Sequence, residues 1–294
     1  MEMQQLRYVA AIARAGNFSR AAEQCHVAQP SLSQQIQKLE DELGERLFDR
    51  LKRAAKLTPA GEVFLRRAVH ILHEVDAARR ESAEAKNLLR GTIILGVLPT
   101  VAPYLLPDAM AKFIQRFPGV EIVVEEDTTA RLLKQALAYE IDFALVSPPI
   151  NEERLAVKDL LVEELLLALP PRHPLARKRM VKAADLAGER LIVMKEGHCL
   201  GDQVLRFCER GDVRPQIAFR SAQLETIQAL VRAGLGISLI PAMARQKDPD
   251  RRLEYRSLRS PCPERKIVAV WPKQRPPGRA ANELLKAISD RSVG

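Results

Sequence analysis

The feature that most constrains this chain is a run of about 30 residues that contains no strong helix breaker. The run opens at Thr58-Pro59, where threonine can cap a helix and proline suits the first turn, and it ends at Gly91. A helix of that length exceeds the usual range in globular proteins and needs a partner. Apolar or small residues recur along it at alternating steps of four and three: Phe64, Ala68, Ile71, Val75, Ala78, Ser82, Ala85 and Leu89. This heptad seam predicts a dimer, and the helix separates an N-terminal head from a longer C-terminal part.

The head contains three shorter helical patterns. The first ends at Gly16-Asn17, the second can be capped by Ser19, and the third begins at Gln29-Pro30 and ends at Gly44. The third pattern has one apolar stripe, formed by Leu32, Ile36, Leu39 and Leu43. Two short helices, a tight turn and a polar-faced second helix have the layout of a helix-turn-helix. A plain helical bundle with a solvated face is the alternative.

The polar face of the third helix carries side chains that can donate to base edges and phosphates. These candidate DNA contacts are Gln29, Ser31, Ser33, Gln34 and Lys38. A basic segment follows, and it fits a wing that touches the phosphate backbone. Its candidate phosphate contacts are Arg50, Lys52 and Arg53. The formal net charge of +9 suggests an anionic partner, for which double-stranded DNA is the first candidate.

Composition and missing motifs exclude several other classes of protein. The 294 residues are 47% hydrophobic and can fill two or three cores. No apolar run approaches the roughly 20 residues needed to cross a bilayer, so we expect a cytoplasmic protein without a membrane partner. Four cysteines without a CxxC pair argue against a disulfide framework and a structural zinc site, so we expect no metal or cofactor. The GxxxxGK, HExxH and GxSxG patterns of common enzymes are absent, and no catalytic motif emerges.

The C-terminal part alternates short apolar strands with helices, which predicts an α/β fold with parallel, doubly wound sheets. Two chain crossings between its halves predict a hinge with a ligand cleft beyond the carboxyl ends of the strands. The predicted segments are a DNA-binding head over 1–58, a linker and dimerisation helix over 59–90, and an effector domain over 91–294, with subdomains at about 91–162 plus 267–294 and at about 163–266.

Two of the four cysteines share one predicted helix. Gly197-His198 follows a strand and places Cys199 at the helix N-terminus, where the helix dipole favours a thiolate over a thiol. Helical periodicity puts Cys199 on a polar face and Cys208 on an apolar face. Because free cysteine is often simply buried, two structural thiols are the alternative. We expect Cys25 and Cys262 to be structural.

A set of motifs spans the head and the start of the linker: Ala21-Ala22, residues 27–36 (VAQPSLSQQI), Lys38-Leu39-Glu40, Leu43-Gly44, Leu47-Phe48-Asp49-Arg50 and Leu57-Thr58-Pro59-Ala60-Gly61. Together these motifs resemble the DNA-binding head of LysR-type transcriptional regulators, and the resemblance extends over essentially the whole chain. It implies a winged helix-turn-helix, a long linker helix and a two-subdomain effector domain that is similar to periplasmic binding proteins.

The cysteine segment resembles the redox segment of the peroxide-sensing members of that family. The matching residues are Gly197-His198-Cys199-Leu200, Asp202-Gln203 and Phe207-Cys208. This resemblance implies that Cys199 is the peroxidatic thiol, that Cys208 is the resolving thiol, and that Thr100, His198 and Asp202 lie in the peroxide pocket.

Three positions leave alternatives open. Thr100 can instead cap the helix that follows it, and the two roles are compatible. Gly201 stands where the resemblance leads us to expect a basic side chain. Arg265-Lys266 supplies positive charge near the cleft, but the sequence does not decide which of the two side chains points inward.

The implied regulator senses hydrogen peroxide, activates antioxidant genes and assembles as a dimer or tetramer. Its implied partners are promoter DNA, RNA polymerase and a thiol reductant such as glutaredoxin or thioredoxin. One alternative is a LysR-type regulator that senses a small metabolite in the same cleft with inert cysteines. A thiol peroxidase is a third class, which the helix-turn-helix head disfavours.

Overall fold

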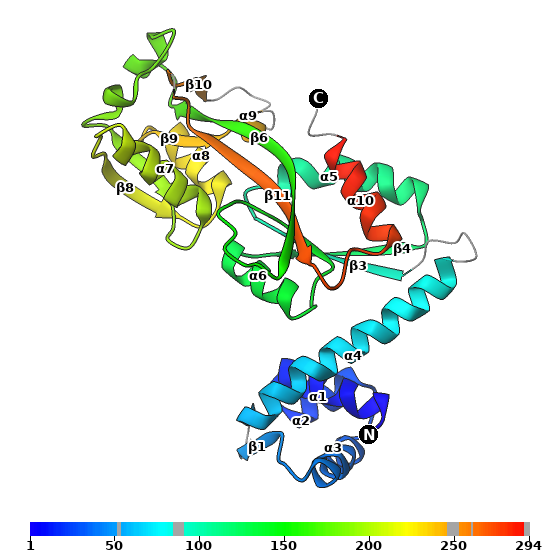
Figure 1. The fold of residues 1–294 in the computed structure, drawn as a ribbon. Coiled ribbons are helices and arrows are strands. Elements are labelled where there is room, and N and C mark those ends of the chain that lie inside the picture. Colours follow the sequence, from blue (N-terminus) through cyan, green and yellow to red (C-terminus); the bar gives the residue numbers. More distant parts are fainter. Residues whose placement is uncertain (52–53, 85–90, 246–252, 260, 291–294) are drawn as a thin grey trace. The chain divides into compact units, whose positions relative to one another are not determined.

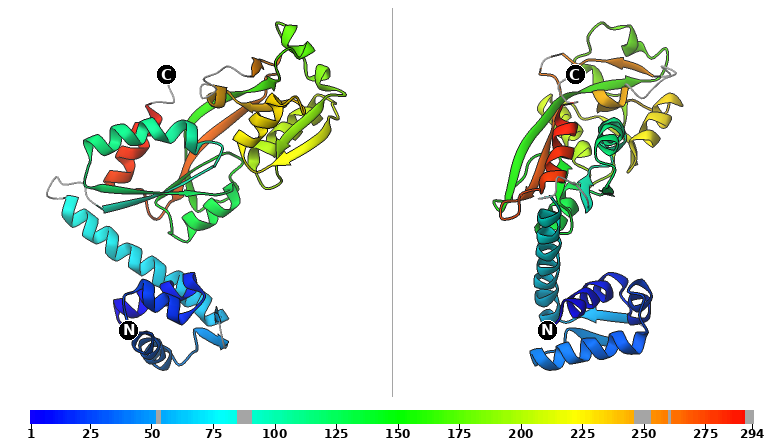
Figure 2. Two further views of the ribbon diagram at one scale, coloured as in Figure 1. Left: turned by 180° about the vertical axis from the view of Figure 1, so that it is seen from behind. Right: turned by 90° about the vertical axis from the view of Figure 1, so that its right-hand side faces the viewer.

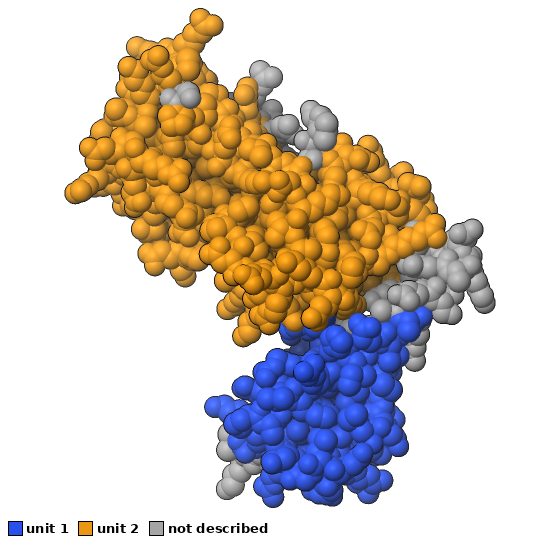
Figure 3. All heavy atoms as spheres, viewed as in Figure 1, with its two compact units in different colours: residues 1–89, 138–140 blue, residues 90–137, 141–294 orange. Residues whose placement is uncertain are grey.

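The structure, a computed structural model, describes residues 1–51, 54–84, 91–245, 253–259 and 261–290. The chain divides into two compact units, residues 1–89 with 138–140 and residues 90–137 with 141–294, shown in two colours in Figure 3. We describe each unit by itself. No helix in the described parts of the chain is both long enough and apolar enough to cross a membrane.

The N-terminal unit is a helical head with a two-stranded hairpin and a long helix. Its elements are α1 (Met3–Ala15), α2 (Phe18–Gln24), α3 (Gln29–Leu43), β1 (Phe48–Leu51), β2 (Ala54–Leu57) and α4 (Pro59–Glu84). As expected, α1 and α3 end at Gly16 and Gly44, whose φ angles of 65° and 68° are left-handed and suit glycine. Thr58 caps α4, because its Oγ1 accepts the N–H of Gly61 at 2.9 Å. The helix-turn-helix and the antiparallel wing hairpin are therefore both present.

Two details of the head differ from the sequence prediction. Asn17 rather than Ser19 caps α2, since its Oδ1 accepts the N–H groups of Ser19 at 2.8 Å and Arg20 at 3.2 Å. Leu43 is exposed and does not belong to the apolar stripe of α3. Glu40 is buried instead, and its Oε1 accepts the N–H of Leu47 at 2.8 Å, which ties the end of α3 to the start of the wing. At this end of α3 the buried Glu40 carboxylate, which accepts backbone N–H groups, takes the interior place that periodicity alone predicted for Leu43.

The predicted heptad seam of α4 is partly used inside the protomer. Ala68 is buried, and Phe64 packs against the core of the head, because α4 lies against α1. Ile71 and Ala78 are exposed and can meet a second copy. Of the remaining seam positions, Ala85 and Leu89 lie outside the described residues. The first turns of the helix therefore anchor the head, and the seam available for pairing begins at Ile71.

The C-terminal unit has two α/β halves. The first half contains β3 (Gly91–Val97), α5 (Ala102–Arg116), β4 (Val120–Glu126), α6 (Thr129–Leu137), β5 (Phe143–Val146) and the C-terminal helix α10 (Arg279–Ser289). The second half contains β7 (Arg190–Met194), α7 (Cys199–Arg210), β8 (Gln216–Ser221), α8 (Leu224–Arg232), β9 (Ser238–Pro241), α9 (Ala242–Arg245) and β10 (Glu254–Arg256). Two long strands, β6 (Leu155–Leu169) and β11 (Glu264–Pro272), connect the halves (Figure 1).

The long strands make the main sheet mixed rather than parallel. β3 pairs in parallel with β4 and β5, but β11 lies antiparallel between β5 and β6. The sheet order is β10-β6-β11-β5-β3-β4, with β9 added to β6, while β7 and β8 form a separate parallel pair. Figure 2 shows β6 and β11 side by side in both views. The two crossings predicted from the sequence are therefore two adjacent strands, and the predicted subdomain boundaries fall inside them.

Candidate functional site

The two cysteines of α7 lie in opposite environments. Gly197 has a φ of 88°, a left-handed turn that glycine adopts freely, and it leads the chain from β7 into α7. Cys199 is the first residue of α7 and is half-buried in the wall of a cleft of about 580 Å³. Cys208 is 1% exposed and packs in the apolar core of the second half. Both thiols are free, as expected for a reduced protein, and the predicted contrast in their burial is present.

The acidity of Cys199 is not what its place at a helix start predicts. Burial raises the pKa of the Cys199 thiol, and the Asp202 carboxylate adds to that effect. The Thr129 hydroxyl and the Arg265 guanidinium act in the opposite direction on the pKa of Cys199, but burial outweighs them. Burial likewise raises the pKa of Cys208. At the helix start the backbone N–H of Leu200 also lowers the pKa of Cys199, as the sequence predicts, but desolvation is the larger effect and the net pKa shift is upward.

Thr129 is a site residue that sequence reasoning missed. It begins α6, and its buried Oγ1 has no hydrogen-bond partner among the described residues but lies close enough to Cys199 to lower the pKa of that thiol. The register of the sheet could have pointed to Thr129. Val97 of β3 pairs with Glu126 of β4 in parallel, so the segments after both strands reach the same edge. Thr100 and Thr129 each follow their paired residue by three positions, and both belong to this edge.

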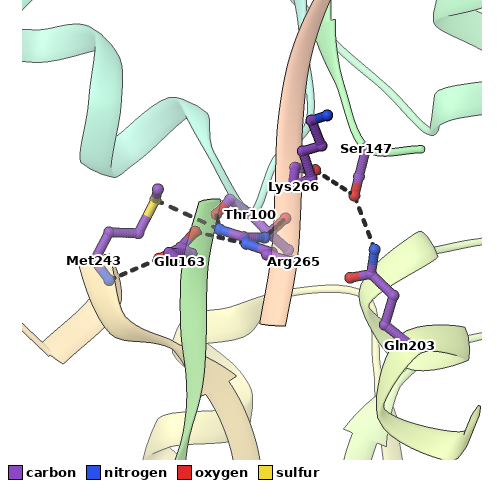
Figure 4. A network of polar contacts seen from close by, with 7 residues as sticks. All are labelled: Thr100, Ser147, Glu163, Gln203, Met243, Arg265 and Lys266. Atoms are coloured by element: carbon purple, nitrogen blue, oxygen red, sulfur yellow. Dashed lines mark hydrogen bonds and ion pairs between the residues drawn. The ribbon is translucent and has the colours of Figure 1, made fainter. Parts of the chain in front are cut away.

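Arg265 is the inward member of the basic pair, and it organises a buried network (Figure 4). Its Nη1 donates to Oγ1 of Thr100 at 3.0 Å, and its Nη2 donates to the Thr100 carbonyl at 3.1 Å. Its Nε donates to Oε1 of Glu163 at 2.6 Å, with side-chain exposures of 0% for Arg265 and 9% for Glu163. Glu163 also accepts the N–H of Met243 at 2.9 Å. Lys266 instead pairs with Asp159 at 2.6 Å near the surface.

The network decides the role of Thr100 as well. The residue that caps α5 is Val101, without a side-chain hydrogen bond, so Thr100 does not cap that helix. Its hydroxyl is buried and accepts from Arg265 instead. Thr100 thus fixes the guanidinium whose charge favours the thiolate form of Cys199. It reaches the site through Arg265 and is not among the residues that line the cleft.

The remaining polar side chains of α7 differ in how firmly they are held. Nε2 of Gln203 donates to Oγ of Ser147 at 2.8 Å, and that hydroxyl donates to the carbonyl of Lys266 at 2.8 Å (Figure 4). Asp202 is exposed and lines the cleft. His198 is half-buried, and its ring makes no hydrogen bond within the part of the chain that the structure describes. The cleft thus brings together Cys199, Thr129 and Asp202, with Arg265 and Thr100 behind them.

Close packing explains why residue 201 is a glycine. A Cβ at this position would lie 2.8 Å from the carbonyl oxygen of Met194 in β7, closer than real side chains approach. The residue is buried, so α7 rests directly on the β7 backbone at its first turn. The basic side chain that the resemblance led us to expect here does not fit this packing.

The candidate DNA contacts of α3 form an exposed face. Gln29, Ser31, Gln34 and Lys38 are exposed, whereas Ser33 is half-buried and less available than predicted. Arg50 lies in β1, and its side chain is not among those described. Lys52 and Arg53 lie outside the described residues. The face of α3 opposite its buried stripe is thus polar and free of the apolar core.

Comparison with known proteins assigns the family. The model of the LysR substrate binding domain matches residues 86–292, and that of the bacterial regulatory helix-turn-helix protein, lysR family, matches residues 3–62. The chain belongs to the LysR family. Members of this family are DNA-binding transcriptional regulators and not enzymes.

The relatives include regulators named for hydrogen peroxide. The chain is 36% identical over 297 residues to the DNA-binding transcriptional dual regulator OxyR of Escherichia coli K12, covering 100% of this chain and 97% of that protein. It is 35% identical to the hydrogen peroxide-inducible genes activator of Pectobacterium carotovorum, covering 100% and 98%. A full-length OxyR variant from Pseudomonas aeruginosa is 33% identical and superposes with a TM-score of 0.82 over 98% of this chain and 94% of that one. Full-length CbnR in complex with its target DNA is 25% identical, with a TM-score of 0.72 over 99% and 100%.

Proposed function

We propose that this chain is a transcriptional regulator that senses hydrogen peroxide through Cys199 and Cys208. The observation that carries the proposal is that one helix holds one thiol in the wall of a cleft and a second thiol in an apolar core. The names of the relatives, several of them hydrogen peroxide-inducible genes activators, support the same function. The target genes of the proposed regulator are those of an antioxidant response.

The first chemical step is oxidation of Cys199. Its thiolate attacks one oxygen of the peroxide, so that an S–O bond forms and the O–O bond breaks. The departing oxygen takes up a proton and leaves as water, and Cys199 becomes a sulfenic acid. Because burial raises the pKa of Cys199, the thiolate is a minority at neutral pH. Arg265 and Thr129 then matter, since both favour the charged form.

The second step requires α7 to open. Nine helical steps of about 1.5 Å separate the two Cα atoms by about 13.5 Å, whereas a disulfide needs about 7 Å or less. Cys208 must therefore leave its core before it can attack the sulfenic sulfur, form the S–S bond and release water. Local opening of so short a segment costs a few kcal/mol. Closing a loop of about ten residues contributes about 2.7 kcal/mol in the chain-entropy model, which is comparable and holds the rearranged state.

The proposal is tested by peptide mapping after stoichiometric hydrogen peroxide. We expect a linked Cys199–Cys208 peptide in the wild type, no response in Cys199→Ser, and a trapped sulfenic acid or mixed disulfide in Cys208→Ser. Cys25→Ser and Cys262→Ser are matched controls that should respond as the wild type does. A full change in DNA binding without the linked peptide would contradict the mechanism and favour the metabolite-sensing alternative.

The proposed DNA and self contacts follow from the exposed faces of α3 and α4 and from the basic segment around Lys52 that the sequence predicts. Gln34 on α3 is placed to read bases, so its substitution should relax sequence preference, whereas Lys52→Ala should weaken all sequences alike and lower the salt slope by about one. Ile71→Lys on the exposed part of the α4 seam should convert a dimer or tetramer to monomers in analytical ultracentrifugation. If neither DNA variant changed affinity or salt dependence, this docking would be wrong. RNA polymerase and a reductant such as glutaredoxin or thioredoxin complete the proposed cytoplasmic partners.

A further inference from the structure

A second cavity, separate in most of its lining from the Cys199 cleft, lies along the C-terminal half of α7. Its volume is about 630 Å³, and α7 contributes Gln203, Arg206, Phe207 and Arg210 to its wall. We propose that this cavity binds a small organic anion with an apolar body, and that occupation keeps α7 folded. The second part rests on the peroxide-sensing function proposed above.

The charge of the cavity selects an anion. Lys182, Arg206, Arg210 and Arg259 line it together with a single carboxylate, Glu264. Within the described residues none of these four cationic side chains forms an ion pair. Elsewhere on the same unit exposed cations do find partners, as Lys178 does with Asp185 at 2.7 Å. Four unpaired cations around one concavity create a positive potential that a carboxylate, sulfonate or phosphate group would neutralise.

The rest of the lining requires the anion to carry a hydrocarbon part. Phe207 is half-buried, Pro263 is buried, and Ala183 and the Pro148-Pro149 rings add further apolar surface. The volume falls in the range of about 300–1,000 Å³ that is typical of small-molecule sites.

The position of the cavity couples its occupation to the redox helix. Phe207 lines the cavity while its neighbour Cys208 packs in the core, so one turn of α7 serves both. Unwinding α7 to bring Cys208 to Cys199 would dismantle this wall. A ligand that binds only the folded helix lowers the open population by the factor 1 + [L]/Kd. At ten times Kd, disulfide formation should slow by up to about elevenfold, and by reciprocity oxidation should weaken ligand binding.

Binding is tested on the reduced full-length protein with anilinonaphthalene sulfonate, a fluorescent aromatic anion. Arg259→Glu should weaken the probe at least about tenfold, because it reverses a charge in the wall. Lys134→Glu is the matched control, since Lys134 lines only the Cys199 cleft and its reversal should leave affinity unchanged. Cys262 is exposed and lines the cavity, so the probe should protect it from iodoacetamide, whereas Cys25 in the other unit should keep its rate. Unchanged affinity in Arg259→Glu, equal loss in Lys134→Glu, or no protection of Cys262 would overturn the site.

Coupling is tested by following disulfide formation after peroxide, with and without the probe at ten times its Kd. The proposal expects slower bridge formation and an unchanged rate of sulfenic acid formation at Cys199, measured by dimedone trapping. An equal rate of bridge formation with the probe bound would refute the coupling while leaving the peroxide function intact. No bridge in the absence of the probe would instead refute the peroxide function, and the binding results would stand by themselves.

Discussion

Cys199 lies between two regions that are held together in different ways. Behind it, Arg265 is fixed by directional bonds to Thr100 and Glu163, fully out of solvent. The second region is α7, the helix that carries Cys199, and it is anchored mainly by apolar packing of buried residues such as Leu200, Val204 and Cys208. A buried polar network tolerates few arrangements, because each broken contact leaves an unsatisfied group, whereas apolar packing is non-directional and can be remade. We therefore expect the Arg265 network to be the fixed frame of the site and α7 to be its movable part.

The largest effect should come from the frame. Arg265→Ala removes the guanidinium that neutralises the largely buried carboxylate of Glu163 and donates to the hydroxyl of Thr100, which should cost about 3–5 kcal/mol of unfolding free energy. Lys266→Ala is the control one position along, and its exposed pair with Asp159 should contribute no more than about 1 kcal/mol. Urea unfolding of both variants measures the difference.

A double substitution keeps that comparison informative if Arg265→Ala fails to fold. Replacing both Arg265 and Glu163 by Met removes the two charges together and should cost less than removing Arg265 alone. Equal losses in Arg265→Ala and Lys266→Ala would show that the network is not the rigid region.

The next effect should come from the contact between α7 and β7. Gly201→Ala gains about 1 kcal/mol of helix propensity, but its Cβ meets the Met194 carbonyl at 2.8 Å. Because that neighbour is backbone and cannot swing away, we expect a net loss of about 1–3 kcal/mol, typical of overpacking. Glu209→Ala, exposed on the same helix, should stay within about 0.5 kcal/mol. A stabilised Gly201→Ala protein would mean that α7 already sits loosely on β7.

Local sequence patterns were enough to predict much of the fold and part of the site. The predicted alternation of strands with helices is present, and β4 and β5 are short segments rich in apolar residues such as Val, Ile and Phe. The burial of Cys208 follows from the helical period alone. The antiparallel placement of β11 between β5 and β6 depends on partners about 100 residues away, which no local pattern encodes. For the same reason the sequence could not choose between Arg265 and Lys266 or assign Thr129, and it missed the burial that reverses the expected acidity of Cys199.

The smallest effect should come from Thr129, whose hydroxyl lies beside the reactive thiol. Its hydroxyl holds the pKa of Cys199 below the level that burial alone would set, so Thr129→Val should raise that pKa further. At neutral pH the thiolate fraction falls, and oxidation by peroxide should slow severalfold, while well above the pKa of Cys199 the two proteins should react alike.

The pH dependence of the unfolding free energy should also report the Cys199 thiol, and its sign follows from the direction of the pKa shift. A thiol whose pKa is raised by folding stabilises the protein fully below the unfolded pKa of about 8.5, and this contribution is lost as pH rises through the folded pKa. Unfolding free energy should therefore fall with pH above about 8.5, more steeply in Thr129→Val than in the wild type and less steeply in Cys199→Ser. Thr129→Ser keeps the hydroxyl and is the matched control. If Thr129→Ser and Thr129→Val changed the pH profile of peroxide oxidation equally, the hydroxyl would have no part in setting the acidity of Cys199, and the frame would act on the thiol through Arg265 alone.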